Sequence, residues 1–159
     1  MSVNLGDIID YNQQQVEHIQ RVQKLVFNFC SQLMEAALEH DASKFSPLEY
    51  YTFVQSKSTL NESKDGKDDN YQKFLNSPGI QKHITENSHH PEYWDVKEKL
   101  MPVTEIIIMF FDWLSRSQQR HTNFNDFWIF NCEKLKNQPH ALEIVKTLKR
   151  EIIDKVSST

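Results

Sequence analysis

The chain has 159 residues, a length that suits one domain able to bury a core. Hydrophobic residues make up 38% and charged residues 25%, a balance typical of a soluble globular protein rather than a disordered one. The formal charge of −4 argues against duplex DNA or an anionic membrane as a partner. The most apolar stretch, residues 106–111, is too short to span a bilayer, and the start of the chain lacks a signal-peptide pattern. We therefore expect a cytoplasmic protein.

Glycine and proline are scarce, with three and five residues respectively, which predicts a mostly helical chain. The expected fold is all-α, a single-domain bundle of about seven or eight helices. The two cysteines, Cys30 and Cys132, lie in apolar helical segments and suit reduced core thiols.

The first predicted helix is capped by Asp7 and runs through His18. Apolar residues recur along it at steps of three and four, the period of a helix with one buried face. This stripe consists of Val16, Ile19, Val22, Val26, Phe29 and Leu33. His18 lies on the same side of the helix as Val22, so we expect its imidazole to face the core.

His18 and the adjacent pair His40-Asp41 can share a metal only if the helix between them breaks. The 22 residue steps from His18 to His40 would span about 33 Å as one straight helix. The segment Phe27–Ser31 contains weak helix formers, so we predict the break there, with Ser31 capping a second helix over residues 32–40.

A third helix is predicted to begin at Pro47, where Ser46 and Glu49 form a capping box. We interpret the polar residues 56–70 as a flexible surface loop and a candidate lid. Further helices are expected over residues 70–76, 80–90, 92–100, 103–120, 122–137 and 139–156. Asp112 lies inside the most apolar of them, where a buried unpaired carboxylate is costly. It must face water, pair with Arg116 one turn on, or bind a metal.

Imidazole and carboxylate side chains recur on four or five of these helices, as a metal site in a bundle core requires. The candidate ligands are His18, His40, Asp41, His83, His89, His90 and Asp112. His83 and His90 fall seven residues apart, on one face of their predicted helix. Such a ligand mixture without thiolate suits Mn, Fe, Co, Ni or Zn and leaves Mg open.

Each ligand also has a structural alternative. His18 alone on a helix can be a hydrogen-bonded core histidine, and His40 can sit near a helix C-terminus, where a cation is favoured. Asp41 can cap the next turn, and the His89-His90 pair before a proline can belong to a surface loop. Taken together, the set favours a metal site.

The order His18, His40-Asp41, Asp112 resembles the H…HD…D signature of the HD-domain superfamily of metal-dependent phosphohydrolases. The opening His18-Ile19-Gln20-Arg21-Val22 is similar to the start of many HD domains. More narrowly, residues 40–45 (HDASKF) and 87–94 (NSHHPEYW), with Asp112-Trp113 downstream, look like a small HD-like family found in phages and other viruses. The resemblance covers roughly residues 15–116, where we expect the metal-site core, and residues 122–159 would add C-terminal helices.

The resemblance implies one divalent metal held by His18, His40, Asp41 and Asp112. A second metal would be held by His83 and by His90 or His89, with Asp41 bridging. The implied activity is hydrolysis of a phosphate ester by a metal-activated water, with a nucleotide or deoxynucleotide as substrate. In a viral setting the protein would act in the host cytoplasm.

Charged residues near these motifs are candidates for catalytic roles. Lys44, Arg21 and Arg116 could bind a phosphate, although Lys44 also suits an exposed surface position. Glu86 and Glu92 are possible general acid or base groups. Aromatic residues that could stack on a base, or equally form core, are Tyr50, Tyr51, Tyr93 and Trp94.

Two other functions are compatible with the same residues. Some binuclear HD proteins are di-iron oxygenases, and a non-catalytic binding protein could retain the fold with or without a metal. Whether the protein forms a homo-oligomer is left open.

Overall fold

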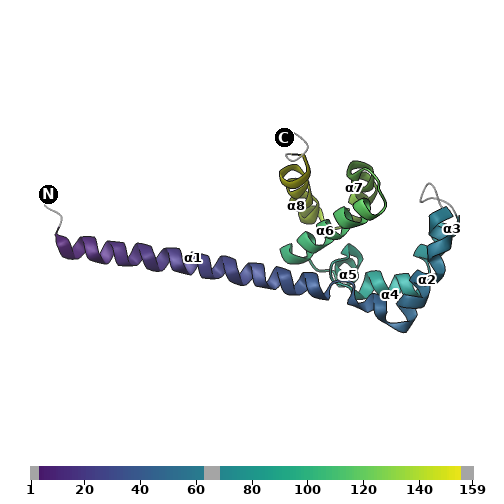
Figure 1. Ribbon diagram of the computed structural model, residues 1–159, viewed down its shortest axis with the longest axis horizontal. Coiled ribbons are helices and arrows are strands. Elements are labelled where there is room, and N and C mark those ends of the chain that lie inside the picture. The colour runs from purple at the N-terminus through teal and green to yellow at the C-terminus, as the bar shows by residue number, and fades with distance from the viewer. Residues whose placement is uncertain (1–3, 63–68, 155–159) are drawn as a thin grey trace. The chain divides into compact units, whose positions relative to one another are not determined.

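The computed structural model of the chain describes residues 4–62 and 69–154, with the side chains of residues 57–62 and 70 excluded. The all-α prediction is confirmed, because the described residues form eight α-helices and no strand (Figure 1). The α-helices are α1 (Leu5–Glu39), α2 (Pro47–Glu62), α3 (Asp69–Leu75), α4 (Pro78–Glu86), α5 (Pro91–Val96), α6 (Val103–Gln119), α7 (Phe124–Cys132) and α8 (Pro139–Lys149). Two short 3₁₀ helices, η1 (Ala42–Phe45) and η2 (Glu133–Leu135), and a final π-helical turn, η3 (Arg150–Asp154), complete the described elements.

The chain divides into two compact units, residues 1–38 and residues 39–159. The described part of the first unit is the bulk of α1. Its N-terminus is capped by Asn4 rather than by Asp7, since Asn4 Oδ1 accepts a hydrogen bond of 2.6 Å from the backbone N–H of Gly6. Every described residue of α1 before Ser31 is exposed, and this includes His18, which we expected to face the core.

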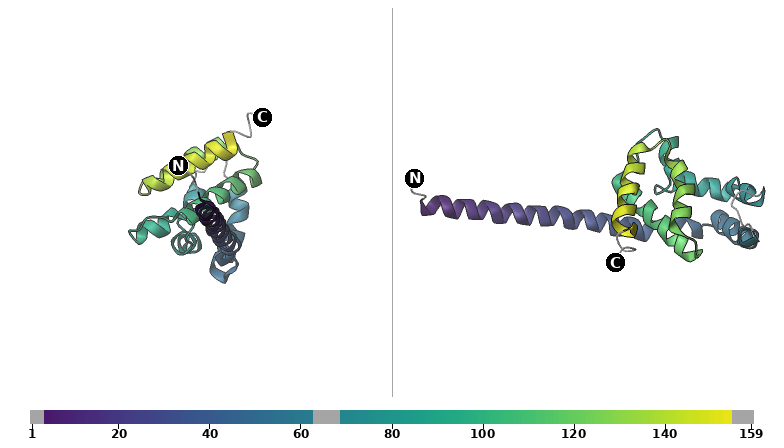
Figure 2. Two further views of the ribbon diagram at one scale, coloured as in Figure 1. Left: turned by 90° about the vertical axis from the view of Figure 1, so that its left-hand side faces the viewer. Right: turned by 90° about the horizontal axis from the view of Figure 1, so that it is seen from above.

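The predicted break in the first helix is wrong. α1 runs without interruption from Leu5 to Glu39, and Figure 2 shows it as one rod. Ser31 does not cap a new helix, because its hydroxyl donates a hydrogen bond of 3.1 Å to the carbonyl of Phe27 one turn earlier. Weak helix formers cost only tenths of a kcal/mol each, which a helix this long tolerates.

In the second unit, α2 and α4 pack closely because Gly79 lies at their contact. A Cβ atom on Gly79 would overlap the hydroxyl of Thr52 and lie 3.0 Å from the backbone oxygen of Leu48. The two helices can pack this closely only because glycine has no side chain. This contact fixes where the rest of α4 lies relative to α2.

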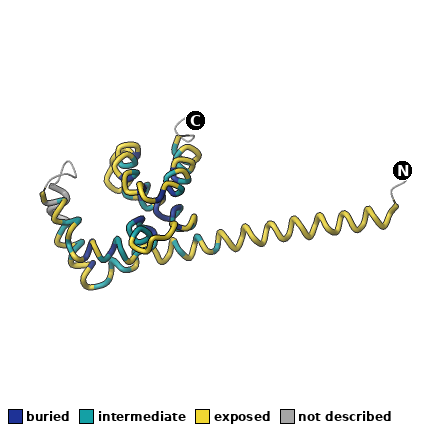
Figure 3. Tube along the Cα trace, turned by 180° about the vertical axis from the view of Figure 1, so that it is seen from behind, coloured by how far each residue is buried: buried dark blue, intermediate teal, exposed yellow. Residues whose placement is uncertain are grey.

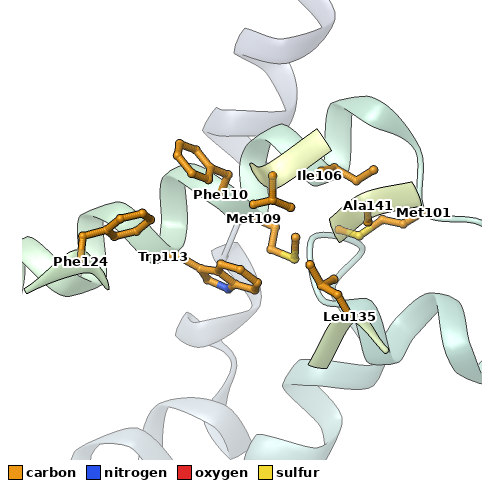
Figure 4. Close-up of a cluster of buried hydrophobic side chains, with 9 residues drawn as sticks. Met101, Ile106, Met109, Phe110, Trp113, Phe124, Leu135 and Ala141 are labelled. Carbon is orange, nitrogen blue, oxygen red and sulfur yellow. The ribbon is translucent and has the colours of Figure 1, made fainter. Parts of the chain in front are cut away.

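The hydrophobic core of the second unit is built mainly by α6, α7 and α8 (Figure 4). Ile106, Phe110 and Trp113 follow one face of α6, and Leu135 and Val145 cover them from η2 and α8. Figure 3 shows that the buried residues gather in this unit, whereas α1 is almost entirely exposed. The apolar character of α6 is therefore used in packing, as the sequence predicted.

Several element boundaries differ from the sequence-based prediction. The predicted loop over residues 56–70 begins too early, because α2 continues to Glu62 and α3 begins at Asp69; residues 63–68 lie outside the described residues. The helix predicted over residues 80–90 ends at Glu86, with Asn87 as its C-cap. His89 and His90 therefore lie in the short connection before α5, which starts at Pro91.

Within residues 4–62 and 69–154, no helix combines the length and the apolar character needed to cross a membrane.

Candidate metal centre

Asp41 is placed by an abrupt turn after α1. The helix ends at Glu39, and Asp41 adopts a left-handed conformation with φ 62° before η1 begins. Few residues other than glycine adopt this conformation, and aspartate and asparagine do so more readily than most. The turn directs the chain into η1, and the Asp41 carboxylate is partly buried.

Three imidazoles converge on Asp41. His83 Nε2 lies 3.2 Å and His89 Nε2 3.3 Å from Asp41 Oδ1, while His90 Nε2 lies 3.0 Å from His83 Nε2. One ligand atom from each of these four residues lies within 4.8 Å of the others. A group of this composition and size could hold a metal ion.

The hydrogen bonding of these atoms fits a metal better than it fits a polar network. Among the described residues, Asp41 Oδ1 and His89 Nε2 are buried, yet neither has a partner with hydrogen-bond geometry despite their short separation. Buried polar atoms are nearly always hydrogen bonded, so two adjacent orphans call for an explanation. A cation between them would satisfy both atoms.

A second group shares the same aspartate. His40, Asp41 and Asp112 also offer ligand atoms within 4.8 Å of one another, and His40 Nε2 lies 4.0 Å from Asp41 Oδ2. Asp112 projects from the middle of α6 and pairs with Arg116 at 3.4 Å, so the Arg116 pair that was the alternative to a metal is present. The pairing does not remove Asp112 from the group, because one carboxylate has two oxygens.

Two cations flank the same carboxylate. Lys44 Nζ contacts Asp41 Oδ2, and Arg116 Nη2 lies 3.4 Å from the same oxygen. Lys44 is largely buried, so it does not occupy the exposed surface position that was its alternative. Asp41 Oδ1 thus faces His83 and His89. Asp41 Oδ2 faces Lys44 and Arg116.

The surroundings of these groups shift their pKa values. Burial alone would raise the pKa of Asp41, but the close approach of His83 and His89 and the charge of Lys44 hold it well below its usual range. Burial, followed by the charge of Arg116, lowers the pKa of Lys44. Burial and the neighbouring imidazoles lower the pKa of His90 well below its usual value. A neutral imidazole beside an ionised carboxylate is the combination that metal binding needs.

Glu49 belongs to the centre, although the sequence did not indicate it as a site residue. Its carboxylate is fully buried, and its Oε2 lies 2.9 Å from His83 Nδ1. The capping-box pattern predicted that Glu49 would bond the backbone at Ser46, but the side chain points to His83 instead. In the sequence, Glu49 stands out only by its spacing of three residues from Ser46. That spacing is explained by helix capping and gives no reason to expect a site residue.

Six predicted residues are in neither ligand group; Lys44 and Arg116 contact Asp41, and the other four are His18, Arg21, Glu86 and Glu92. His18 and Arg21 lie on the exposed part of α1, in the first unit, and the helix break that a site shared by His18 and His40 required does not form. A metal site that includes His18 stays a prediction. Glu86 is exposed and pairs with Lys82 at 2.9 Å, and Glu92 lies in the first turn of α5.

The aromatic residues predicted for base stacking divide into two kinds. The Trp94 indole N–H donates a hydrogen bond of 2.6 Å to the backbone oxygen of Ser88, and the ring packs against the hydrophobic core. Trp94 therefore has the structural role that was its alternative. Tyr50 and Tyr51 on α2 are exposed.

Comparison with known proteins identifies one family. The model of a family of unknown function, DUF5662, matches residues 7–157 of the chain. No curated protein and no solved structure matches the chain significantly. Since the match covers nearly the whole sequence, the chain belongs to the DUF5662 family.

Proposed function

We propose that this protein is a metal-dependent phosphohydrolase. The observation that supports the proposal is the sharing of Asp41 by two ligand groups, one with His83, His89 and His90, the other with His40 and Asp112. The two groups would hold up to two divalent ions, with Asp41 as a member of both. A bound divalent ion lowers the pKa of water and neutralises charge on a phosphoryl oxygen.

The proposed substrate carries an anionic phosphate, because two cations stand beside the ligands. Lys44 and Arg116 both contact Asp41 Oδ2, and we propose that they turn part of their hydrogen-bonding capacity to phosphate oxygens when a substrate binds. Arg116 presents a planar fork suited to two phosphate oxygens, whereas Lys44 acts as a point charge. Their role is to bind and orient the phosphate.

The substrate class we propose is a nucleotide or deoxynucleotide. Tyr50 and Tyr51 are exposed and follow Glu49 directly on α2, so their rings are available to a flat base. Stacking of this kind contributes about 1–3 kcal/mol per base.

The test is a screen for phosphate release from nucleotides and simple phosphate esters, with Mn, Co, Ni, Zn, Mg or Fe added in turn. We expect release that depends on the metal and is lost in Asp41→Ala, with nucleotides as better substrates than simple esters. The absence of release from every phosphorylated compound would refute the phosphohydrolase.

Metal analysis of the purified protein separates the other functions. Two iron ions with a visible absorption band would favour an oxygenase instead. A protein that binds no metal after reconstitution would favour a non-catalytic binding role.

A further inference from the structure

Glu49 is a fully buried carboxylate, and two of its three partners, Lys82 and His83, lie 33 and 34 residues away in the sequence. Its Oε2 lies 2.9 Å from His83 Nδ1 and 2.7 Å from the hydroxyl of Ser43. Its Oε1 lies 3.4 Å from Lys82 Nζ. A buried charge is retained only when its hydrogen bonds are satisfied, and here a hydroxyl, an ammonium and an imidazole all face it.

The hydrogens around His83 can be assigned by counting donors. The amide nitrogen of Asn87 uses its two hydrogens on the Ser43 hydroxyl oxygen and on the His83 backbone oxygen, each at 2.8 Å. The Ser43 hydroxyl donates its only hydrogen to Glu49. Ser43 Oγ and Asn87 Nδ2 also lie 3.3 Å and 3.1 Å from His83 Nδ1. Because their hydrogens are used elsewhere, we assign a hydrogen to Nδ1 that it donates to Glu49.

This assignment decides what the other ring nitrogen can do. With the Nδ1 hydrogen held by Glu49, the Nε2 of His83, which faces Asp41 and His90, is the ring atom left to bind a metal, and any hydrogen on it would leave as the metal binds. The ring is also held by Phe53, whose edge contacts it at a centroid distance of 5.5 Å. Carboxylates that accept from a ligating histidine fix its tautomer and increase its basicity.

We propose that Glu49 is a positioning residue that holds His83 as a metal ligand through the chain Asn87–Ser43–Glu49–His83. The inference rests on the metal centre of the proposed function but not on phosphate hydrolysis. Glu49 is in neither ligand group, and it would act only through the His83 ring.

The experiment compares Zn²⁺ affinity in the full-length wild type and in Glu49→Gln, by competition with a chromophoric chelator. Gln preserves the shape of the side chain but removes its charge. We expect Zn²⁺ affinity to fall about 10- to 100-fold. The matched control is Glu143→Gln, which removes an exposed carboxylate that pairs with Lys146 on α8, and its affinity should stay within about twofold of wild type.

A second readout follows the ring itself, since lost affinity alone could reflect a looser fold. In Zn²⁺-loaded protein with ¹⁵N-labelled histidine, the Nδ1 hydrogen of His83 should give a downfield signal that is absent in His83→Ala. In Glu49→Gln that signal should move upfield and exchange faster with water. Circular dichroism verifies the fold. If Glu49→Gln does not fold, Ser43→Ala, which removes the donor to Glu49, should produce the same changes to a smaller degree.

The outcomes separate this inference from the proposed hydrolysis. Wild-type affinity with an unchanged His83 signal in folded Glu49→Gln would overturn the role of Glu49. Weakened Zn²⁺ binding without any phosphate release would support Glu49 and refute only the hydrolase. Equal Zn²⁺ binding by wild type and His83→Ala would remove His83 from the centre, and the role of Glu49 with it.

Discussion

Replacing Gly79 with alanine should loosen the contact between α2 and α4 and thereby the metal centre. The new Cβ would overlap the Thr52 hydroxyl and lie 3.0 Å from the backbone oxygen of Leu48, which cannot rotate away. Overpacking of this kind costs about 1–3 kcal/mol, while alanine in a helix regains at most about 1 kcal/mol over glycine. We expect a net loss of about 1–2 kcal/mol in the free energy of unfolding, measured by urea denaturation.

The chain offers a matched control in Gly6→Ala. Both glycines are the second residue of their helix, but the new Cβ at Gly6 would meet only the exposed side chain of Asn4, 3.0 Å from its Oδ1. If Asn4 moves, the exposed cap that it forms is weakened, so we expect a loss of at most about 1 kcal/mol, smaller than that of Gly79→Ala. In Gly79→Ala, adding Thr52→Ala should restore only part of the loss, because the Thr52 Cβ also lies 2.6 Å from the new atom. A free energy of unfolding for Gly79→Ala within about 0.5 kcal/mol of wild type would refute the reasoning.

Three further predictions concern acid stability, thiol reactivity and the first helix. Because the fold lowers the pKa of Asp41, the ionised carboxylate stabilises the folded state above the usual carboxyl pKa near 4, and this contribution is lost as the pH falls below it. In urea denaturation, the free energy of unfolding of Asp41→Asn should therefore vary less with pH than that of the wild type. Burial raises the pKa of Cys132 to about 11. In a Cys30→Ser variant, where Cys132 is the remaining thiol, alkylation of Cys132 at pH 9 should therefore be slow until the protein unfolds. Spin labels at positions 17 and 39 of a cysteine-free variant should lie about 33 Å apart, and a distance below about 20 Å would restore the predicted break.

The helices that the sequence predicted best are those with local signals. Proline at the first helical position marked α2 at Pro47, and the apolar run beginning at Val103 marked α6 almost to its last residue. Both signals act between residues within one or two turns, so they hold whatever the remainder of the chain does. The break near Phe29 failed because it relied on weak propensities, which the neighbouring turns of a long helix override.

The candidate site was predictable as a set of residue types but not as a geometry. The members of both ligand groups were all expected: His40, Asp41, His83, His89, His90 and Asp112. The predicted helix over residues 80–90, however, ends before His89 and His90. These two histidines lie near Asp41 because the chain leaves α4 at Asn87 and turns into α5. Helical phase favoured His90, in line with His83, whereas the structure includes both His89 and His90 in one group.

The sequence by itself determined that the chain is helical and that histidines and aspartates suited to a metal are present, because composition and periodicity act locally. Only the tertiary structure decided which of them meet. α1 continues through the predicted break, and the close packing of α2 on α4 at Gly79 brings Glu49 to His83, 34 residues along the chain. Such contacts depend on the packing of whole helices, so no local pattern in the sequence specifies them.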